Sequence, residues 1–228
     1  MFDRIAKAFF TPLKFSIASG HFYSCLLRKS VDIKGNPIPM LTYRALAQLS
    51  QIDLSQLSIL EFGTGQSSLY FAPRVKKLTG VEQNRQWADY VNQNFKKINP
   101  EINHTKIYVC EDIQSFQEIL NSQLLSQYFD IIIIDGVPYP GGSRLEAAEF
   151  VLKKENRPKL IILDNSDLPL SLEIKNLFHE SGYVRIDFVG HSPAAYFMQC
   201  TSFLFEPVNT EWIFGRNQAI SIRHFESE

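Results

Sequence analysis

One short segment, Ile59 to Tyr70 (ILEFGTGQSSLY), constrains the fold of this chain more than any other. There an apolar run ends in Glu61, and a Gly-x-Gly turn follows at Gly63 and Gly65 before a predicted helix begins. A strand that enters a glycine turn and then a helix is typical of parallel α/β domains that bind a nucleotide-like ligand. The glycines let the backbone approach that ligand closely because no Cβ intervenes, and the helix start offers free N–H groups.

Four further apolar segments also end in acidic or polar residues. Glu82 comes about 20 residues after the glycine turn, the spacing at which an acid accepts hydrogen bonds from ribose hydroxyls. The other three segments end at Glu111-Asp112, Asp135-Gly136 and Asp164-Asn165. Because the ligand of an open parallel sheet lies beyond the carboxyl ends of its strands, we expect these residues to surround one crevice.

Strands and helices alternate along the chain, which predicts a doubly wound, mostly parallel sheet of the α/β class. The strands are predicted at 58–62, 77–82, 106–110, 130–134 and 160–163, and the helices at 67–72, 85–97, 115–126, 144–153 and 170–180. Two more strands near the end, GYVRIDFVG and YFMQCTSFLFEP, are joined by a short turn. They predict a hairpin, so that the last of seven strands runs antiparallel.

Residues 1–57 are expected to form an N-terminal helical cap, and residues 58–228 a Rossmann-like domain. The first residues are amphipathic, with Arg4 and Lys7 among apolar residues at helical spacing: Phe2, Ile5, Ala6, Phe9 and Phe10. Such a helix either binds an anionic membrane surface or covers the domain. The second interpretation is favoured because Pro12 should limit the helix to about three turns.

Composition is that of an ordinary globular protein, with 45% hydrophobic and 21% charged residues. The formal net charge of −1 and the lack of a basic stripe argue against a nucleic-acid partner. The three cysteines, Cys25, Cys110 and Cys200, fit neither a disulfide framework nor a zinc site, which favours a reducing cytoplasm. No apolar run is long enough to cross a bilayer. The sequence does not predict an oligomeric state.

The pattern resembles the class I S-adenosylmethionine-dependent methyltransferases. The resemblance spans residues 58–205 and is carried by the glycine turn with its preceding acid, the acids after strands two and three, and the terminal hairpin. The nearest rival is an NAD-type Rossmann oxidoreductase, whose fingerprint has a third glycine where this chain has Ser68. A cofactor-binding module without turnover is a third interpretation.

The resemblance implies a set of contacts to S-adenosylmethionine. Gly63 and Gly65 would hold its methionine part, while Glu61 orients the loop or contacts the ligand amine through water. Glu82 would bind the ribose, with Gln83 lining the adenosine pocket.

Asp112 would accept a hydrogen bond from the adenine amine, and Ile113 would lie against the ring. Trp87 either lines this pocket or belongs to the core. For Asp112 and Glu82 a second interpretation stays open, in which each caps the helix that follows it.

The acids after strands four and five allow two interpretations. Asp135, Asp164 and Asn165 resemble the trio that binds a divalent cation in catechol and caffeoyl-coenzyme A O-methyltransferases, and such oxygen ligands suit Mg²⁺ or Mn²⁺. Those relatives carry a lysine where this chain has Pro138. Alternatively, Asp135 is a strand-end acid near the sulfonium and Asp164-Asn165 forms a turn.

A second resemblance is to a group of bacterial methyltransferases without an assigned substrate. It is carried by Gly35 to Tyr43, Asp135-Gly136, Arg144 and Leu163 to Asp167. It implies that Arg144 fixes an anionic substrate or pairs with Asp135.

His191, in the predicted hairpin turn, is the candidate general base if no metal binds. The alternative is that it is a solvated turn residue. Tyr139, in the loop after strand four, is also expected to line the acceptor pocket. The expected reaction is O-methylation of a small or medium polar acceptor, such as a saccharide. The predicted catalytic residues are thus Asp135, Arg144 and His191.

Overall fold

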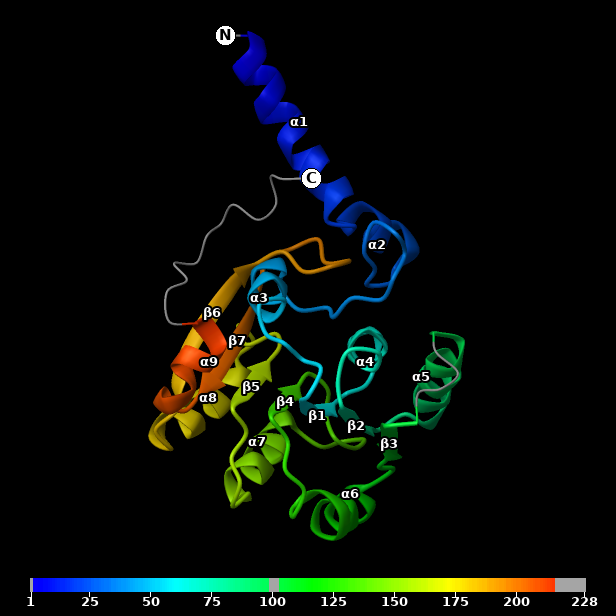
Figure 1. Ribbon diagram of the computed structural model, residues 1–228, viewed down its shortest axis with the longest axis vertical. Coiled ribbons are helices and arrows are strands. Elements are labelled where there is room, and N and C mark those ends of the chain that lie inside the picture. Colours follow the sequence, from blue (N-terminus) through cyan, green and yellow to red (C-terminus); the bar gives the residue numbers. More distant parts are fainter. Residues whose placement is uncertain (1, 99–102, 216–228) are drawn as a thin grey trace.

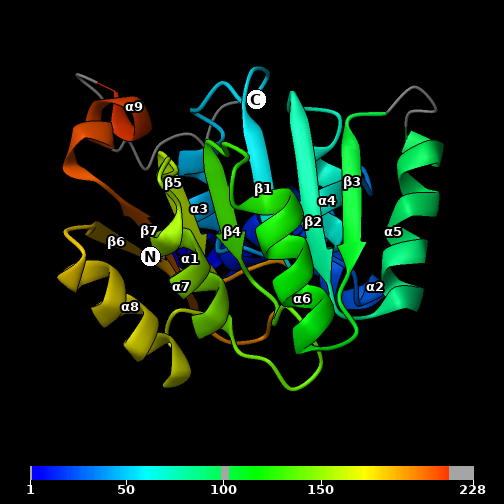
Figure 2. The same cartoon turned by 90° about the horizontal axis from the view of Figure 1, so that it is seen from below.

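The structure, a computed structural model, describes residues 2–98 and 103–215. Its centre is a seven-stranded sheet in the order β3-β2-β1-β4-β5-β7-β6 (Figures 1 and 2). The strands are β1 (Ser58–Phe62), β2 (Lys77–Glu82), β3 (Thr105–Val109), β4 (Ile131–Ile134), β5 (Leu160–Leu163), β6 (Val184–Gly190) and β7 (Gln199–Phe205). Neighbours among β1 to β5 pair in parallel, whereas β7 pairs antiparallel with β5 and β6. The predicted α/β sheet with a terminal hairpin is confirmed.

Helices cover both faces of this sheet (Figure 1). One face packs against α3 (Tyr43–Leu49), α4 (Gln66–Phe71), α5 (Arg85–Ile98) and α9 (Thr210–Phe214), which follows the short 3-10 turn η2 (Pro207–Asn209). The other packs against α6 (Ile113–Ile119), the π-helical turn η1 (Leu120–Leu124), α7 (Arg144–Lys153) and α8 (Leu170–Glu180). The isoleucines of β4 alternate between the two layers, and this explains their unbroken apolar run.

The ends of the elements agree closely with the sequence prediction, with one informative difference. The helix predicted at 115–126 begins at Ile113, because the Asp112 side chain caps it by accepting from the Ser115 N–H at 2.8 Å. Its second half is the π-helical turn η1. Such turns follow from backbone geometry that apolar spacing does not encode.

The N-terminal helices differ from the favoured interpretation. Helix α1 (Phe2–Ala18) continues through Pro12 and projects from the body of the molecule, with α2 (His21–Leu27) at its base (Figure 1). The prediction of a helix of about three turns that covers the domain is therefore wrong. A proline removes one backbone donor, but its fixed φ is compatible with a helix, so the helix need not end there.

Helix α3 packs into the same core layer as β1 through Ala45 and Leu49, and Leu41, just before the helix, joins them. The division of the chain into a cap at 1–57 and a domain at 58–228 stays a prediction, and residues 216–228 of that domain lie outside the described residues. Within 2–98 and 103–215, no helix has the length and apolar character needed to span a membrane.

Candidate functional site

The loops after β1 and β4 touch backbone to backbone. Gly63 has a φ of +88°, and a Cβ placed on it would lie 2.4 Å from the Gly136 nitrogen. The Phe62 carbonyl accepts from the N–H groups of Asp135 and Gly136 at 3.1 and 2.7 Å. From β1 the chain adds β2 and β3 on one side of the sheet and then returns to add β4 and β5 on the other side. The switch point therefore lies between β1 and β4, and open α/β sheets bind their ligands at such a point.

A buried hydrogen-bond relay supports the glycine loop from beneath. The Gly65 N–H donates to the Ser68 hydroxyl at 2.9 Å, and this hydroxyl donates to the Glu61 carboxylate. Glu61 is fully buried, and its second oxygen has no hydrogen-bond partner. Burial raises the pKa of Glu61 to about 8. Glu61 therefore acts on the loop through Ser68, in agreement with the first of its two predicted roles.

The Glu82 carboxylate holds the same loop from the side of β2. One of its oxygens accepts from the backbone N–H and the hydroxyl of Thr64, at 2.9 and 3.0 Å. Its other oxygen accepts from the Asn84 N–H at 2.9 Å. The Trp87 indole donates to the Thr64 carbonyl at 2.6 Å. Glu82 and Trp87 thus fix the central residue of the Gly-x-Gly turn.

An open recess of about 470 Å³ lies along the loop that follows β2. It is lined by Gln83, Asn84, Arg85, Gln86 and, from the loop after β4, Pro140. The predicted pocket residue Gln83 is therefore placed in a recess at the carboxyl edge. Trp87, for which two interpretations stood open, is 41% exposed and stacks on Tyr90 with ring centroids 5.1 Å apart, so it lies outside the core.

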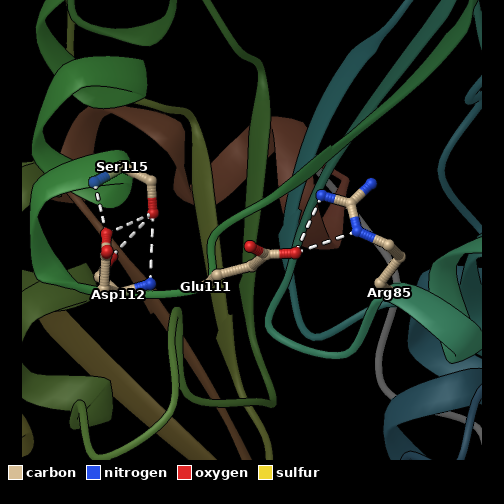
Figure 3. Close-up of polar contacts among 4 residues, drawn as sticks. All are labelled: Arg85, Glu111, Asp112 and Ser115. Atoms are coloured by element: carbon tan, nitrogen blue, oxygen red, sulfur yellow. Dashed lines mark hydrogen bonds and ion pairs between the residues drawn. The ribbon is translucent and has the colours of Figure 1, made fainter.

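Asp112 lies at the exposed start of α6, next to the half-exposed Ile113 (Figure 3). Its carboxylate accepts from the N–H and the hydroxyl of Ser115, both at 2.8 Å, and these bonds lower the pKa of Asp112. The adjacent Glu111 pairs with Arg85 at 2.8 Å. The helix-capping interpretation of Asp112 is thus confirmed, and its contact with adenine stays a prediction.

Arg144 joins the ends of β4 and β5. Its guanidinium donates to the Asp164 carbonyl at 2.8 Å and lies 3.6 Å from an oxygen of Asp135. The Asp135 side chain is 35% exposed, so about two-thirds of it is shielded from water. This desolvation raises the pKa of Asp135, while Arg144 opposes the rise. The predicted pairing of Arg144 with Asp135 is present in the structure.

The predicted metal trio is not supported. Asp164 is buried and accepts from the Thr201 hydroxyl at 2.8 Å, and burial, followed by the charge of Asp135, raises the pKa of Asp164 to about 7. The positive charge that faces Asp135 and Asp164 is that of the Arg144 guanidinium. Within the described ranges, no three His, Cys, Asp or Glu residues are grouped so that they could hold a metal ion. Asn165, the third member, has a φ of +46°, which suits the alternative of a tight turn.

Two predicted pocket residues lie elsewhere. The Tyr139 ring is buried against Phe116, and its hydroxyl bonds Glu146, so Tyr139 is a core residue. His191 is exposed at the start of the β6–β7 connection, with its ring centroid 5.9 Å from that of His21 in α2. Its role as general base stays a prediction.

Sequence reasoning missed Thr64, Ser68 and Thr201 as supporting residues. Thr201 is the most distant: it donates to Asp164 and accepts from the Thr42 N–H at 3.0 Å, across 159 positions of sequence. The position of Thr64 between the two glycines is a weak signal for its role, and so is the position of Ser68 three residues after Gly65 in the first turn of α4. No local pattern predicts the contact of Thr201.

No protein-family model matches the chain, and no curated protein matches its sequence. The chain is similar to a number of solved structures, among them three with TM-scores just below 0.5. The first is the O-methyltransferase from Bacillus cereus in complex with SAH, which is 20% identical at a TM-score of 0.49 over 72% of this chain and 78% of that one. The second is a methyltransferase from Pyrococcus furiosus, 17% identical at a TM-score of 0.49 over 90% of this chain and 99% of that one. The third is the SAH-bound magnesium protoporphyrin IX methyltransferase from Synechocystis PCC 6803, 11% identical at a TM-score of 0.48 over 72% of this chain and 80% of that one. All three are described as methyltransferases. Identities this low assign no activity to the chain, which must be argued from its own residues.

We predict that Gly63→Ala lowers the free energy of unfolding by about 2–4 kcal/mol, because the new methyl group meets the Gly136 backbone in a left-handed conformation. Gly141→Ala is the matched control, since Gly141 has a φ of +81° with nothing within 4 Å of its Cβ position. It should cost only about 1 kcal/mol of left-handed strain. Urea unfolding of both variants measures the difference. Equal losses would contradict the backbone contact.

We predict that Glu61→Gln changes how stability depends on pH. The pKa of Glu61 is about 8 in the folded chain and 4.5 ordinarily, so the unfolded chain loses this proton first as pH rises. The wild-type free energy of unfolding should therefore fall between pH 4.5 and 8, by up to about 1.4 kcal/mol per pH unit from this group. The glutamine variant lacks this component. Urea unfolding across that range would contradict the account if the two curves ran parallel.

Proposed function

We propose that this chain is an S-adenosylmethionine-dependent methyltransferase that binds its cofactor over the Gly63–Gly65 loop. The observation that carries the proposal is the bracing of this loop by two acids at the switch point of the sheet, Glu61 through Ser68 and Glu82 through Thr64. Ser68 stands where a dinucleotide-binding loop has its third glycine. Its buried hydroxyl is used in the relay, which favours this proposal over an NAD-type oxidoreductase.

The charge around the loop also suits this cofactor. Glu61, Asp135 and Asp164 all have raised pKa values. Burial is the main cause, and the negative charges of Asp135 and Glu82 add to it. Arg144 is the cation that lowers two of them. A ligand that carries a sulfonium and an ammonium group would relieve this repulsion, whereas a dinucleotide pyrophosphate would increase it.

Glu82 has room for a limited contact with the ribose. A carboxylate offers about four acceptor positions, and Thr64 and Asn84 use three of those on Glu82. One ribose hydroxyl can therefore donate to the oxygen that faces Asn84 without displacing a protein bond. Gln83 and the recess beside it would receive the adenosine.

S-adenosylmethionine supplies the methyl group when it is bound. Asp135 would accept the proton of the acceptor hydroxyl as the oxygen–methyl bond forms and the sulfur–methyl bond breaks. Desolvation favours this role, because the raised pKa makes Asp135 a stronger base. Arg144 would hold the carboxylate in place as a positioning residue.

The proposed acceptor is a small or medium polar molecule with a hydroxyl group, with saccharides as the leading class. Polar side chains line most of the recess, and the net charge of −1 does not favour a nucleic acid. The proposal needs no divalent cation, because Arg144 already supplies the positive charge beside Asp135 and Asp164.

We predict that Glu82→Gln weakens the binding of S-adenosylhomocysteine about 10–100-fold, because a charge-assisted hydrogen bond to the ribose is lost. The same variant should weaken the binding of the 2′,3′-dideoxy analogue far less, because that analogue lacks the ribose hydroxyls. Thr64→Val is the control, since it disturbs the loop but leaves the carboxylate, and should affect both ligands equally. Isothermal titration calorimetry gives all six affinities. Equal losses for both ligands in Glu82→Gln would refute the ribose contact, and binding of NADH alone would favour the oxidoreductase.

We predict that Asp135→Asn lowers kcat about 10²–10⁴-fold with little change in KM for the cofactor. The acceptor is first identified as the molecule in a cell extract that receives the labelled methyl group from S-adenosylmethionine. Because Arg144 lowers the pKa of Asp135, Arg144→Ala should move the acidic limb of kcat/KM to higher pH, and Arg144→Lys should restore it in part. Full activity of Asp135→Asn, or an unmoved limb in Arg144→Ala, would contradict these roles.

A further inference from the structure

The N-terminal helix α1 exposes an apolar stripe. Its residues Ile5, Leu13 and Ile17 are 63%, 48% and 40% exposed. At 3.6 residues per turn these three positions fall on one half of the helix. Phe15 falls on the other half, where its ring meets that of Tyr43 at 5.6 Å between centroids. The stripe therefore faces away from the contact that joins α1 to the body.

Basic residues accompany this stripe. Arg4 and Lys14 fall on the opposite half of α1, as does Lys7. Residues 2–30 contain five basic residues and one acid, Asp3, although the whole chain has 23 basic and 24 acidic residues. An apolar stripe within a locally cationic segment is the pattern of helices that lie in the plane of an anionic lipid surface.

The apolar surface continues beyond α1. Helix α2 exposes Leu26 and Leu27 at 69% and 58%. The β6–β7 connection exposes Tyr196 and Phe197 at 78% and 64%, and it adjoins α2 through the rings of His21 and His191 (Figure 1). Tyrosine is enriched where a protein meets the lipid headgroups, and phenylalanine is common among the apolar residues that enter the interface.

We propose that α1, with α2 and the β6–β7 connection beside it, docks this protein onto an anionic membrane surface. The apolar stripe enters the boundary between headgroups and acyl chains, and the basic residues contact the lipid phosphates. A second copy of the chain is the less favoured occupant, because pairing two α1 helices would bring two cationic segments together. The proposal does not depend on methyl transfer.

Sedimentation of the full chain with vesicles tests this proposal. Wild type should bind vesicles of phosphatidylcholine with phosphatidylglycerol, bind phosphatidylcholine alone weakly, and lose binding as salt increases. Leu13→Glu/Ile17→Glu should reduce binding at least ~10-fold, since two apolar side chains leave the lipid. Thr11→Glu/Ala18→Glu is the control, with the same charge change on the other half of α1, and should reduce binding much less. All four positions are exposed, so thermal unfolding should be unchanged.

Two results would overturn the proposal. One is that wild type ignores anionic vesicles. The other is equal loss of binding in the stripe variant and its control, because binding would then depend on the net charge of α1 and not on the apolar stripe. If wild type ignores vesicles and is a dimer that Leu13→Glu/Ile17→Glu converts to a monomer, a second copy covers the stripe instead.

Discussion

The backbone contact between Gly63 and Gly136 is the constraint on which the rest of the site depends. It brings the loops after β1 and β4 together at the switch point of the sheet, with less room between them than a methyl group needs. The loop after β1 must then turn outward, and Thr64 at its tip reaches Glu82. Asp135, next to Gly136, is held at the same edge. One steric contact thus places the cofactor loop and the proposed base in fixed relation.

The second organising feature is an accumulation of acids with little compensating charge. Burial raises the pKa values of these acids, and the charges of Asp135 and Glu82 raise them further. Arg144 offsets the rise only for the acids at the ends of β4 and β5. In the free protein this arrangement opposes stability, since charged groups are removed from water without full pairing. The same arrangement becomes favourable when a cationic ligand occupies the crevice. The proposed function follows from this electrostatic complementarity more than from any single residue.

Much of the fold could be predicted from the sequence, because its strands are apolar runs that end in acids. β1, β2 and β5 begin and end where the pattern placed them. The projection of α1 could not be predicted, since the spacing of Ile5 and Phe10 shows an apolar face but not what that face contacts. The burial of the Glu82 side chain also could not be predicted from the sequence. Its bonds to Thr64 depend on how two loops, 18 residues apart, meet in space.

Hydrogen exchange of the backbone amides tests the central claim most directly, which is that the braced glycine loop is a binding site for S-adenosylmethionine. The account predicts that saturating S-adenosylhomocysteine slows exchange at residues 61–68 and 82–87, because the ligand covers the loop and the residues that hold it. NADH should leave both segments unchanged. Slowing by NADH alone, or no change in either segment with S-adenosylhomocysteine, would contradict the account.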